Sequence, residues 1–590
     1  VLGYVNVGIL GLNVNVIMAH AGTKSNSFIS APANSNYEIY GRGGVRVINN
    51  GKVSANTAII PNLVSIKAGA LASNVVKSIL TAAQKAYVDG AFIRADSLTV
   101  KSLYNVKDES GSDGKSTPAA AEGTGAESKV LASVVAVTGA QIQPNVAIAD
   151  SNSTVKSYVN ASGMDISRDI NIITLATSRA VSDILSPTVE VKGASIGINV
   201  LKSNARGSYQ AYLSSYASGD RTAISAGNVS IITSYTADAK SVTTPVGNAG
   251  GVKISGVDIG VNSARSQTSG NAGSVINGNG NVKVTGDVNI ITNGKVSSLT
   301  SSRDSGVTVS ILNVSAPVLN TEIDFTQNAG FDFHGTGTVN GNLVVNSILN
   351  TDSKSEAGAS GVGVELIKGS GYRANADSHS NNTASLEGVG TLSVGSADIE
   401  AKTVSNTKAD ISVGLSVSLL KICPLLADAY SHNSTNAIVR GITLISSGDV
   451  TIISDNKAIA DSVAQTGIGV SLIAGEGSTI RTRIGDAGDK EKSYAAVQSG
   501  TVKAGNDIYV KAYNEGVATA GLTNGVKVSV VGINPGNNIP TYAYYDTQVY
   551  IGGTLDAGRN VEIYAKSFGK GTTAVDGKTS VGVLISSDKK

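Results

Sequence analysis

The sequence predicts an all-β protein, a parallel β-helix (β-solenoid) built from about ten repeats of roughly 57 residues. Three observations favour this fold class. A short strand pattern recurs at a nearly constant interval, apolar and polar residues alternate within it, and the composition suits strands and turns. The 590 residues include 68 Gly, 10 Pro, no Trp and one Cys. A chain of this length exceeds one ordinary core, so repeats are the simplest way to bury it.

The recurring pattern is a turn residue, an aliphatic residue, a variable residue and then Val or Ile. The variable residue is usually polar, as in Arg46, Thr99 and Asn171, so each occurrence predicts a strand with one buried face. We expect the apolar pairs to form a structural ladder through the interior. Its members are Val45 and Val47, Leu98 and Val100, Ile170 and Ile172, Val229 and Ile231, Val288 and Ile290, Leu343 and Val345, Leu392 and Val394, Val450 and Ile452, Ile508 and Val510, and Val561 and Ile563.

Successive pairs begin 53, 72, 59, 59, 55, 49, 58, 58 and 53 residues apart. The 72-residue interval contains residues 107–128, a run of Ser, Gly, Ala, Asp and Glu that predicts a flexible surface insertion. One unit alone would expose its apolar face. We therefore expect each unit to stack on the next, with Val or Ile above Val or Ile at about 4.8 Å.

The architecture predicted for residues 1–590 is a single continuous solenoid. Crossover connections favour right-handedness, and each unit is either one large coil or two smaller ones. A propeller is disfavoured because ten blades exceed the usual number, and tandem β-sandwiches because each unit is short for about seven strands. Residues 70–87 break the pattern, and their spacing suits either a short helix packed on the solenoid or a distorted strand.

Composition also excludes several partners. Lys and Arg number 46 and Asp and Glu 44, with no long run of one sign, so no nucleic acid partner is expected. No stretch reaches the roughly 18 apolar residues of a spanning helix, which predicts no membrane insertion by this segment.

Cys423 lies among apolar residues and is expected to be a small buried hydrophobe. The chain opens and closes in the same phase of its repeat without polar caps, which predicts a longer array or ends that pair with neighbours.

Three segments carry a resemblance to a known family: Gly286-Asp287-Val288-Asn289-Ile290-Ile291-Thr292, Gly448-Asp449-Val450-Thr451-Ile452-Ile453-Ser454 and Ala504-Gly505-Asn506-Asp507-Ile508-Tyr509-Val510. They resemble the repeat regions of filamentous haemagglutinin-like and leukotoxin-type adhesins of Gram-negative bacteria. The resemblance implies a β-helical surface fibre, exported across the outer membrane to the cell surface or beyond, that serves attachment or biofilm cohesion.

β-Helices also carry polysaccharide-processing enzymes, whose catalysis needs carboxylates that converge in a groove. The densest candidates are Glu322, Asp324, Asp332 and His334. We favour solvated outward positions for them, since they alternate with Ile323, Phe325, Phe331 and Phe333. Asp486, Asp489 and Glu491 lack calcium-loop spacing and predict a surface loop, and His20, His334, His379 and His432 lack metal-ligand spacing. The sequence predicts no catalytic residue, metal or cofactor, and a protein that is not an enzyme.

The candidate binding surface is aromatic and consists of Tyr542, Tyr544, Tyr545 and Tyr550. Tyr542 and Tyr544 alternate and should share a face; ordinary strand-surface tyrosines are the alternative. The functional hypothesis is an extracellular structural fibre or adhesin, whose partners are further copies of itself, end to end or laterally, and a host or matrix glycan or protein. The alternatives are a polysaccharide-processing β-helix and a passive spacer that displays a binding domain outside this segment.

Overall fold

The computed structural model describes residues 5–31, 37–59, 64–131, 135–186, 189–216, 222–245, 251–304, 306–359, 361–534, 536–576 and 579–588. Every regular element in these residues is a β-strand, and the same residues contain no helix. The all-β prediction is therefore confirmed.

The strands of the N-terminal half are β1 (Val5–Ser30), β2 (Glu38–Gly51), β3 (Ser54–Ile59), β4 (Val64–Asp89), β5 (Phe92–Tyr104), β6 (Gly125–Leu131), β7 (Val135–Ala161), β8 (Gly163–Ile166), β9 (Asp169–Ser186), β10 (Val189–Tyr216), β11 (Thr222–Ala226), β12 (Asn228–Pro245), β13 (Gly251–Asn279), β14 (Asn281–Val284), β15 (Val288–Asp304) and β16 (Gly306–Ala359). The remainder are β17 (Val362–Ser370), β18 (Tyr372–Ser412), β19 (Leu415–Ile422), β20 (Leu425–Ser446), β21 (Val450–Gln465), β22 (Gly469–Gly475), β23 (Ser478–Ile484), β24 (Glu491–Val497), β25 (Thr501–Ala504), β26 (Ile508–Thr523), β27 (Val526–Asn534), β28 (Asn537–Asn538), β29 (Thr541–Ala543), β30 (Tyr545–Ile551), β31 (Thr554–Ala557), β32 (Val561–Asp576) and β33 (Thr579–Asp588).

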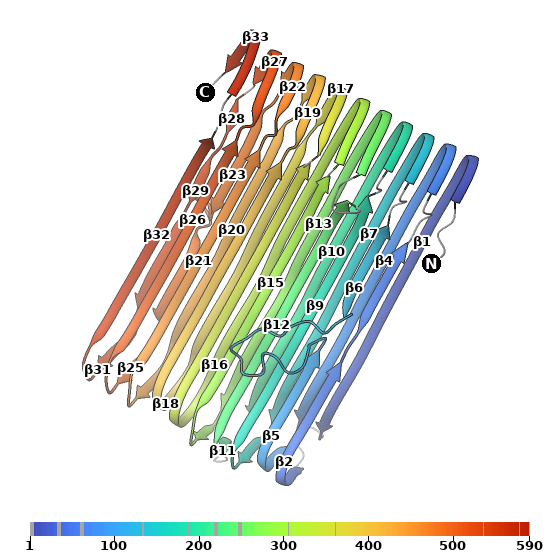
Figure 1. The fold of residues 1–590 in the computed structure, drawn as a ribbon. Helices are drawn as coiled ribbons and strands as arrows, with labels where there is room; N and C mark the ends of the chain where they lie inside the picture. The colour runs from blue at the N-terminus through green and yellow to red at the C-terminus, as the bar shows by residue number, and fades with distance from the viewer. Residues whose placement is uncertain are drawn as a thin grey trace.

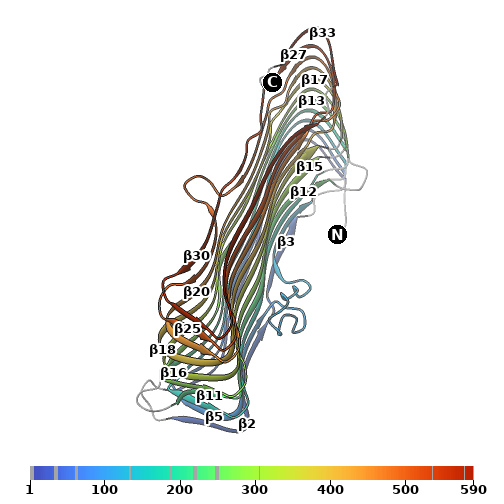
Figure 2. The ribbon, with the colours of Figure 1, turned by 90° about the vertical axis from the view of Figure 1, so that its left-hand side faces the viewer.

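The strands belong to one 33-stranded sheet whose ladders are parallel from one end of the stack to the other. The chain pairs with itself one repeat later: Val45 lies opposite Leu98, and Leu98 in turn lies opposite Ile170. Each repeat therefore forms one layer, or pass, of the stack (Figure 1). Figure 2, which views the passes nearly end on, shows them superimposed as one long, narrow, bent outline.

The predicted ladder lies in the interior. Ile170, Val229, Val288 and Leu343 follow one another in register, and each is at most 1% exposed. The cluster that contains them runs without a break from Val45 to Ala512. Burial of each aliphatic side chain contributes roughly 1.5 to 3 kcal/mol, so this column supplies much of the stability of the stack.

One predicted pair is assigned to the wrong column. Leu392 and Val394 are buried, but Leu392 lies opposite Gly337 and Leu444 in the neighbouring column. The ladder position after Leu343 is occupied by Ala397, and Ile399 follows Val345. Ala397 is small, so its place in the ladder does not stand out in the sequence. With Ala397 in place, the shortest of the predicted intervals disappears, because Ala397 lies almost midway in the chain between Leu343 and Val450.

The last predicted pair differs from the others in burial. Val561 and Ile563 keep the register, opposite Ile508 and Val510 in β26. However, they are 45% and 53% exposed, because no described strand pairs with the far side of β32. These two residues are in the column but not in the buried core of the described stack.

Residues 107–124 form the irregular insertion, and residues 125–128, also assigned to it from the sequence, belong to β6. The insertion lies against the sheet. Thr236 Oγ1 donates to the Pro118 carbonyl at 2.9 Å, Lys101 Nζ lies 2.8 Å from Glu109 Oε2, and Gly114 packs on Ile291. The sequence predicts too little apolar burial for this run to order itself, but later passes supply a surface that it contacts. The flexibility of the insertion stays a prediction.

Residues 70–87 are extended throughout, within β4. Alternate residues point inward: Val76 and Leu80 are fully buried, whereas Lys77 and Thr81 are not. Of the two alternatives for this segment, the structure has the strand, and the helix is wrong. The helical spacing arises because apolar residues such as Val75 and Ile79 occupy outward positions beside the inward Val76 and Leu80.

Candidate functional site

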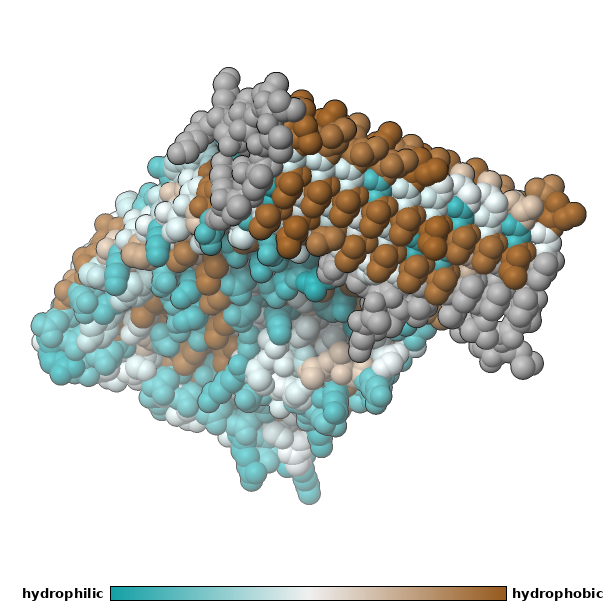
Figure 3. Space-filling view, turned by 45° about the horizontal axis from the view of Figure 1, so that its top comes forward, coloured by the Kyte–Doolittle hydropathy of each residue, from teal (hydrophilic) through white to brown (hydrophobic). Residues whose placement is uncertain are grey.

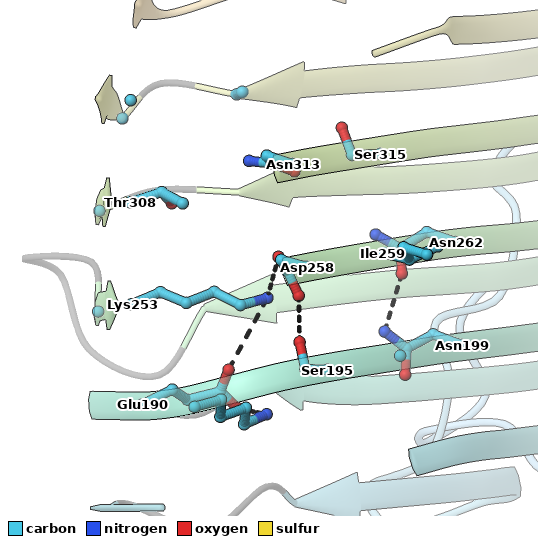
Figure 4. A pocket seen from close by; sticks show the side chains of 18 of the residues that line it. Glu190, Ser195, Asn199, Lys253, Asp258, Ile259, Asn262, Thr308, Asn313 and Ser315 are labelled. Atoms are coloured by element: carbon cyan, nitrogen blue, oxygen red, sulfur yellow. Dashed lines mark hydrogen bonds and ion pairs between the residues drawn. The ribbon is translucent and has the colours of Figure 1, made fainter. Parts of the chain in front are cut away.

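A polar groove of about 230 Å³ lies where β10, β13, β16 and β17 begin (Figure 4). In these first residues the usual alternation is reversed. Glu190 and Lys192 point inward and are each 8% exposed, whereas Val191 between them is 39% exposed. This end of each pass therefore encloses charged and polar groups, and the apolar core lies in the remainder of the pass.

The charges in the groove neutralise one another. Lys192 Nζ lies 2.9 Å from Glu190 Oε1, and Lys253 Nζ lies 2.6 Å from Asp258 Oδ2 and 3.8 Å from Glu190 Oε2 (Figure 4). The Ser195 hydroxyl donates to Asp258. Burial lowers the pKa of Lys192, and the adjacent Glu190 carboxylate opposes this shift. Buried ion pairs of this kind fix the positions of the paired side chains, because separating the partners leaves an uncompensated buried charge.

An asparagine ladder crosses the wall of the groove. Each Nδ2 donates to the Oδ1 of the next pass: Asn15 to Asn74 at 3.0 Å, Asn74 to Asn145 at 2.9 Å, Asn145 to Asn199 at 2.9 Å, and Asn199 to Asn262 at 2.8 Å. The side-chain amides thus pair between passes much as the backbone does. Sequence reasoning missed this ladder, although Asn recurs there at the repeat spacing.

A second polar cluster lies on the outer surface of β18, β20 and β23. The Arg483 guanidinium lies 4.5 Å from the centre of the Tyr430 ring, and its Nη2 lies 3.5 Å from Asp428 Oδ2. His379 and His432 occupy the same position in successive passes, with ring centres 5.7 Å apart. His432 Nε2 also lies 3.1 Å from Asp489 Oδ1. Burial, followed by the Asp428 charge, raises the pKa of Asp377 in this cluster to about 6.

The sequence analysis did not predict this outer cluster. The signal was present, since His379 and His432 recur one repeat apart. His20 and His334 lie elsewhere; His334 is exposed and its Nε2 lies 3.1 Å from Asp332 Oδ1. The described residues contain no group of three or more His, Cys, Asp or Glu side chains arranged to hold a metal ion.

The four carboxylate-cluster candidates point outward from β16. Asp324, Asp332 and His334 are exposed, and Glu322 Oε2 forms an ion pair with Arg265 Nη2 at 2.7 Å. The intervening Ile323, Phe325, Phe331 and Phe333 are at most 1% exposed. Alternation along one strand therefore places these polar residues as expected, flanking the core.

The calcium candidates separate into surface and interior. Asp486 and Asp489 lie in the turn after β23, where Asp486 Oδ1 accepts from the Asp489 backbone N–H at 2.8 Å. The surface position predicted for Glu491 is wrong, because the residue is fully buried at the start of β24. It accepts hydrogen bonds from the Asn433 backbone N–H at 2.8 Å and from the Asn433 and Asn456 amides at 2.6 and 3.0 Å. Burial raises its pKa to about 7.

The four tyrosines do not form one surface. Tyr542 and Tyr544 stack with ring centres 6.2 Å apart, and Tyr542 and Tyr550 are 43% and 50% exposed. The prediction that Tyr545 belongs to the binding surface is wrong. Its side chain packs inward beside Ala458, Ala460 and Ile484, and burial raises its pKa. Consecutive residues at the start of β30 point to opposite faces, so Tyr544 and Tyr545 diverge.

A longer aromatic row lies on β1, β4, β7 and β10 and was also missed. Phe28, Tyr87, Tyr158 and Tyr212 stack with successive ring centres 5.1, 4.8 and 4.7 Å apart. Because each ring covers the face of its neighbour, the row presents ring edges to solvent. This geometry stabilises the stack but leaves few open faces for a sugar ring.

Cys423 is buried, as expected, and burial raises its pKa. Among the described residues there is no helical segment with the length and apolar character that crossing a bilayer requires.

Comparison with family models, with curated proteins and with solved structures gave no match to the chain. The class that fold and sites define is an all-β protein of parallel strands in which successive repeats pair in register. Its polar features are ladders that recur from pass to pass.

Proposed function

We propose that the chain is a right-handed β-solenoid of about ten coils, one per repeat, that forms part of an extracellular fibre and surface adhesin. The observation that carries the proposal is the continuous register. The column that begins at Val45 extends through Val288 and Val450 to Val561. Such a column supports a body in which similar layers repeat along one axis. Such a body presents repeating surfaces suited to multivalent attachment rather than a single deep cleft.

Location and role rest on the family resemblance. We place the chain at the cell surface or outside the cell, after export across the outer membrane, with a host or matrix glycan or protein as its target. The outward polar columns and the partly exposed Tyr542 and Tyr550 are the surfaces offered to that target. Contact at several coils at once would raise avidity without a strong individual site.

Imaging tests the architecture of the proposed fibre. Ten coils at a spacing of about 4.8 Å give a thickness of about 50 Å along the axis. Electron microscopy of the purified chain should show particles of this thickness, and any end-to-end assemblies should lengthen in steps of about 50 Å. Compact spheres, or beads joined by linkers, would contradict the solenoid.

Adhesion tests the role. Beads coated with the purified chain should bind bacterial or epithelial cells, or immobilised matrix glycans, more than beads coated with an unrelated all-β protein. Failure to bind by a chain whose circular dichroism shows an intact fold would rule out adhesion by this segment and favour the passive spacer.

The outer cluster favours a second candidate, a polysaccharide-processing activity. A carboxyl group with a pKa of about 6, such as Asp377, is suited to act as a general acid. Asp428, His379 and Arg483 all interact with it electrostatically. Its neighbour Asp428 also has a raised pKa, chiefly through burial.

Screening tests this activity directly. If the cluster is catalytic, incubation with acidic glycans should release reducing ends or unsaturated products, and Asp377→Asn should lower the rate by about 100-fold or more. The matched control Asp352→Asn changes an exposed carboxylate on β16 and should leave the rate unchanged. Equal rates for the two variants, or no product at all, would reject the enzyme.

A further inference from the structure

The reversed alternation at the start of each pass leaves an aliphatic column facing solvent. Its members follow one another in register through nine passes. Each is between 38% and 45% exposed: Ile66, Val137, Val191, Ile254, Val309, Val364, Val417, Val470 and Val528. A neighbouring column contains Val252, Val307, Val362, Leu415, Ile468 and Val526, between 36% and 48% exposed. We call these two columns the aliphatic face.

The identity of the outward residues is kept more strictly than that of the inward ones. The exposed column from Ile66 to Val528 contains only Val and Ile. The residue that follows each member in the chain varies among Lys, Thr, Ser and Glu, as at Lys192, Ser255 and Glu365. Figure 3 shows the result as rows of apolar side chains across the end of the molecule that carries β17, β19, β22 and β27. An outward column this uniform indicates a surface that another apolar surface covers.

The size of the face fits a stable association. Fifteen Val, Ile and Leu side chains, each about two-fifths exposed, present on the order of 1,000 Å² of apolar area. The largest apolar patch of a typical monomer is about 300–600 Å². A standard interface buries about 800 Å² on each partner. The face is therefore larger than monomers usually leave in water and sufficient for a dimer.

We propose that the aliphatic face is the lateral interface at which two copies of this chain pack face to face. This inference rests on the proposed fibre function, and it identifies a second copy of the chain as the partner. Neither column contains a charged residue, so the face offers nothing to a partner recognised by charge. Its side chains repeat at the spacing between passes, and a second copy repeats at the same spacing. Two such faces interdigitate along their whole length, as the inner faces of paired sheets do at a separation of about 10 Å.

The test is the oligomeric state of the full chain. Sedimentation velocity should show a dimer for the natural sequence. The double variant Val309→Asp and Val364→Asp should be a monomer, with a dissociation constant raised by about 100-fold or more, because adjacent passes would bring four carboxylates into the interface. The matched control, Ser230→Asp and Asn289→Asp, adds the same charges in register on another outward column and should remain dimeric.

Further measurements keep the outcome decisive. Far-UV circular dichroism should show both double variants folded, since Val309 and Val364 are already 40% and 45% exposed. If the Asp variant is unfolded, Val309→Ser with Val364→Ser replaces it and should also weaken the dimer. A monomeric natural chain at tens of micromolar, or equal affinity in variant and control, would overturn the proposal. So would flotation of a monomeric chain with phosphatidylcholine–phosphatidylglycerol vesicles that the Asp variant abolishes, because the occupant would then be lipid. A monomer that still adheres to cells would leave the fibre proposal standing.

Discussion

Ile290→Asp is expected to lower the free energy of unfolding by about 4 kcal/mol or more, the cost of burying an unpaired carboxylate and losing apolar contacts. Ile290 is fully buried in β15, in register between Ile231 in one neighbouring pass and Val345 in the other. Because the position is fully buried, the new carboxylate must either take up a proton or separate the passes. Urea unfolding followed by far-UV circular dichroism measures the effect.

Asn289→Asp is the matched control, because Asn289 is the adjacent residue on the outward face and is only partly buried. Its register partners are Ser230 and Val344, so no like charge lies opposite the new carboxylate. We expect a change below about 1 kcal/mol. Similar losses of stability in the two variants would show that the assignment of inward and outward faces is wrong.

The second large effect is a dependence of stability on pH that originates at Glu491. The carboxyl group has a pKa of about 7 in the folded chain, raised from its ordinary 4.5 chiefly by burial, while three donated hydrogen bonds oppose the rise. Between these two values the folded chain binds the proton more tightly than the unfolded chain does. The free energy of unfolding should therefore fall by about 3 kcal/mol as the pH rises from 4.5 to above 7.

Glu491→Gln isolates this contribution, because Asp377, whose pKa is also raised, acts in the same direction. Gln is nearly the same size but does not titrate. The difference in unfolding free energy between the natural chain and the variant should therefore change by about 2.5 kcal/mol between pH 5 and pH 8. Parallel stability curves across that range would mean that Glu491 titrates normally and is not buried as described.

The alternation of residues was sufficient to predict the strands, and the nearly constant repeat spacing was sufficient to predict that successive repeats pair in parallel. A pair such as Val288 and Ile290 around Asn289 indicates a half-buried strand whatever its neighbours are. Ala397 was missed because a small residue in an apolar column does not stand out from the surrounding turns. The register, which follows from pairing between distant passes, supplies what local pattern cannot.

The same alternation cannot say which face is inward. Glu190, Val191 and Lys192 read equally well as a strand with Val191 buried, but the structure encloses the two charges and exposes the valine. Pairing of the charges with one another removes most of the cost of enclosing them, and that pairing depends on Lys253, which lies opposite Glu190 in the next pass. Glu491 was placed at the surface for the same reason: its partners Asn433 and Asn456 are distant in sequence.

Distances between spin labels test the central claim, that successive repeats stack in register along one axis. Cysteines would replace Thr451 and either Asn171 or Ser230, with Cys423→Ser to remove the native thiol. Asn171 is five passes from Thr451 and Ser230 is four, although both are far from Thr451 in the sequence. At about 4.8 Å per pass, double electron–electron resonance should give backbone separations of about 24 and about 19 Å, one pass apart. Distances beyond about 40 Å, or two values that do not differ by one pass, would contradict the stacked solenoid.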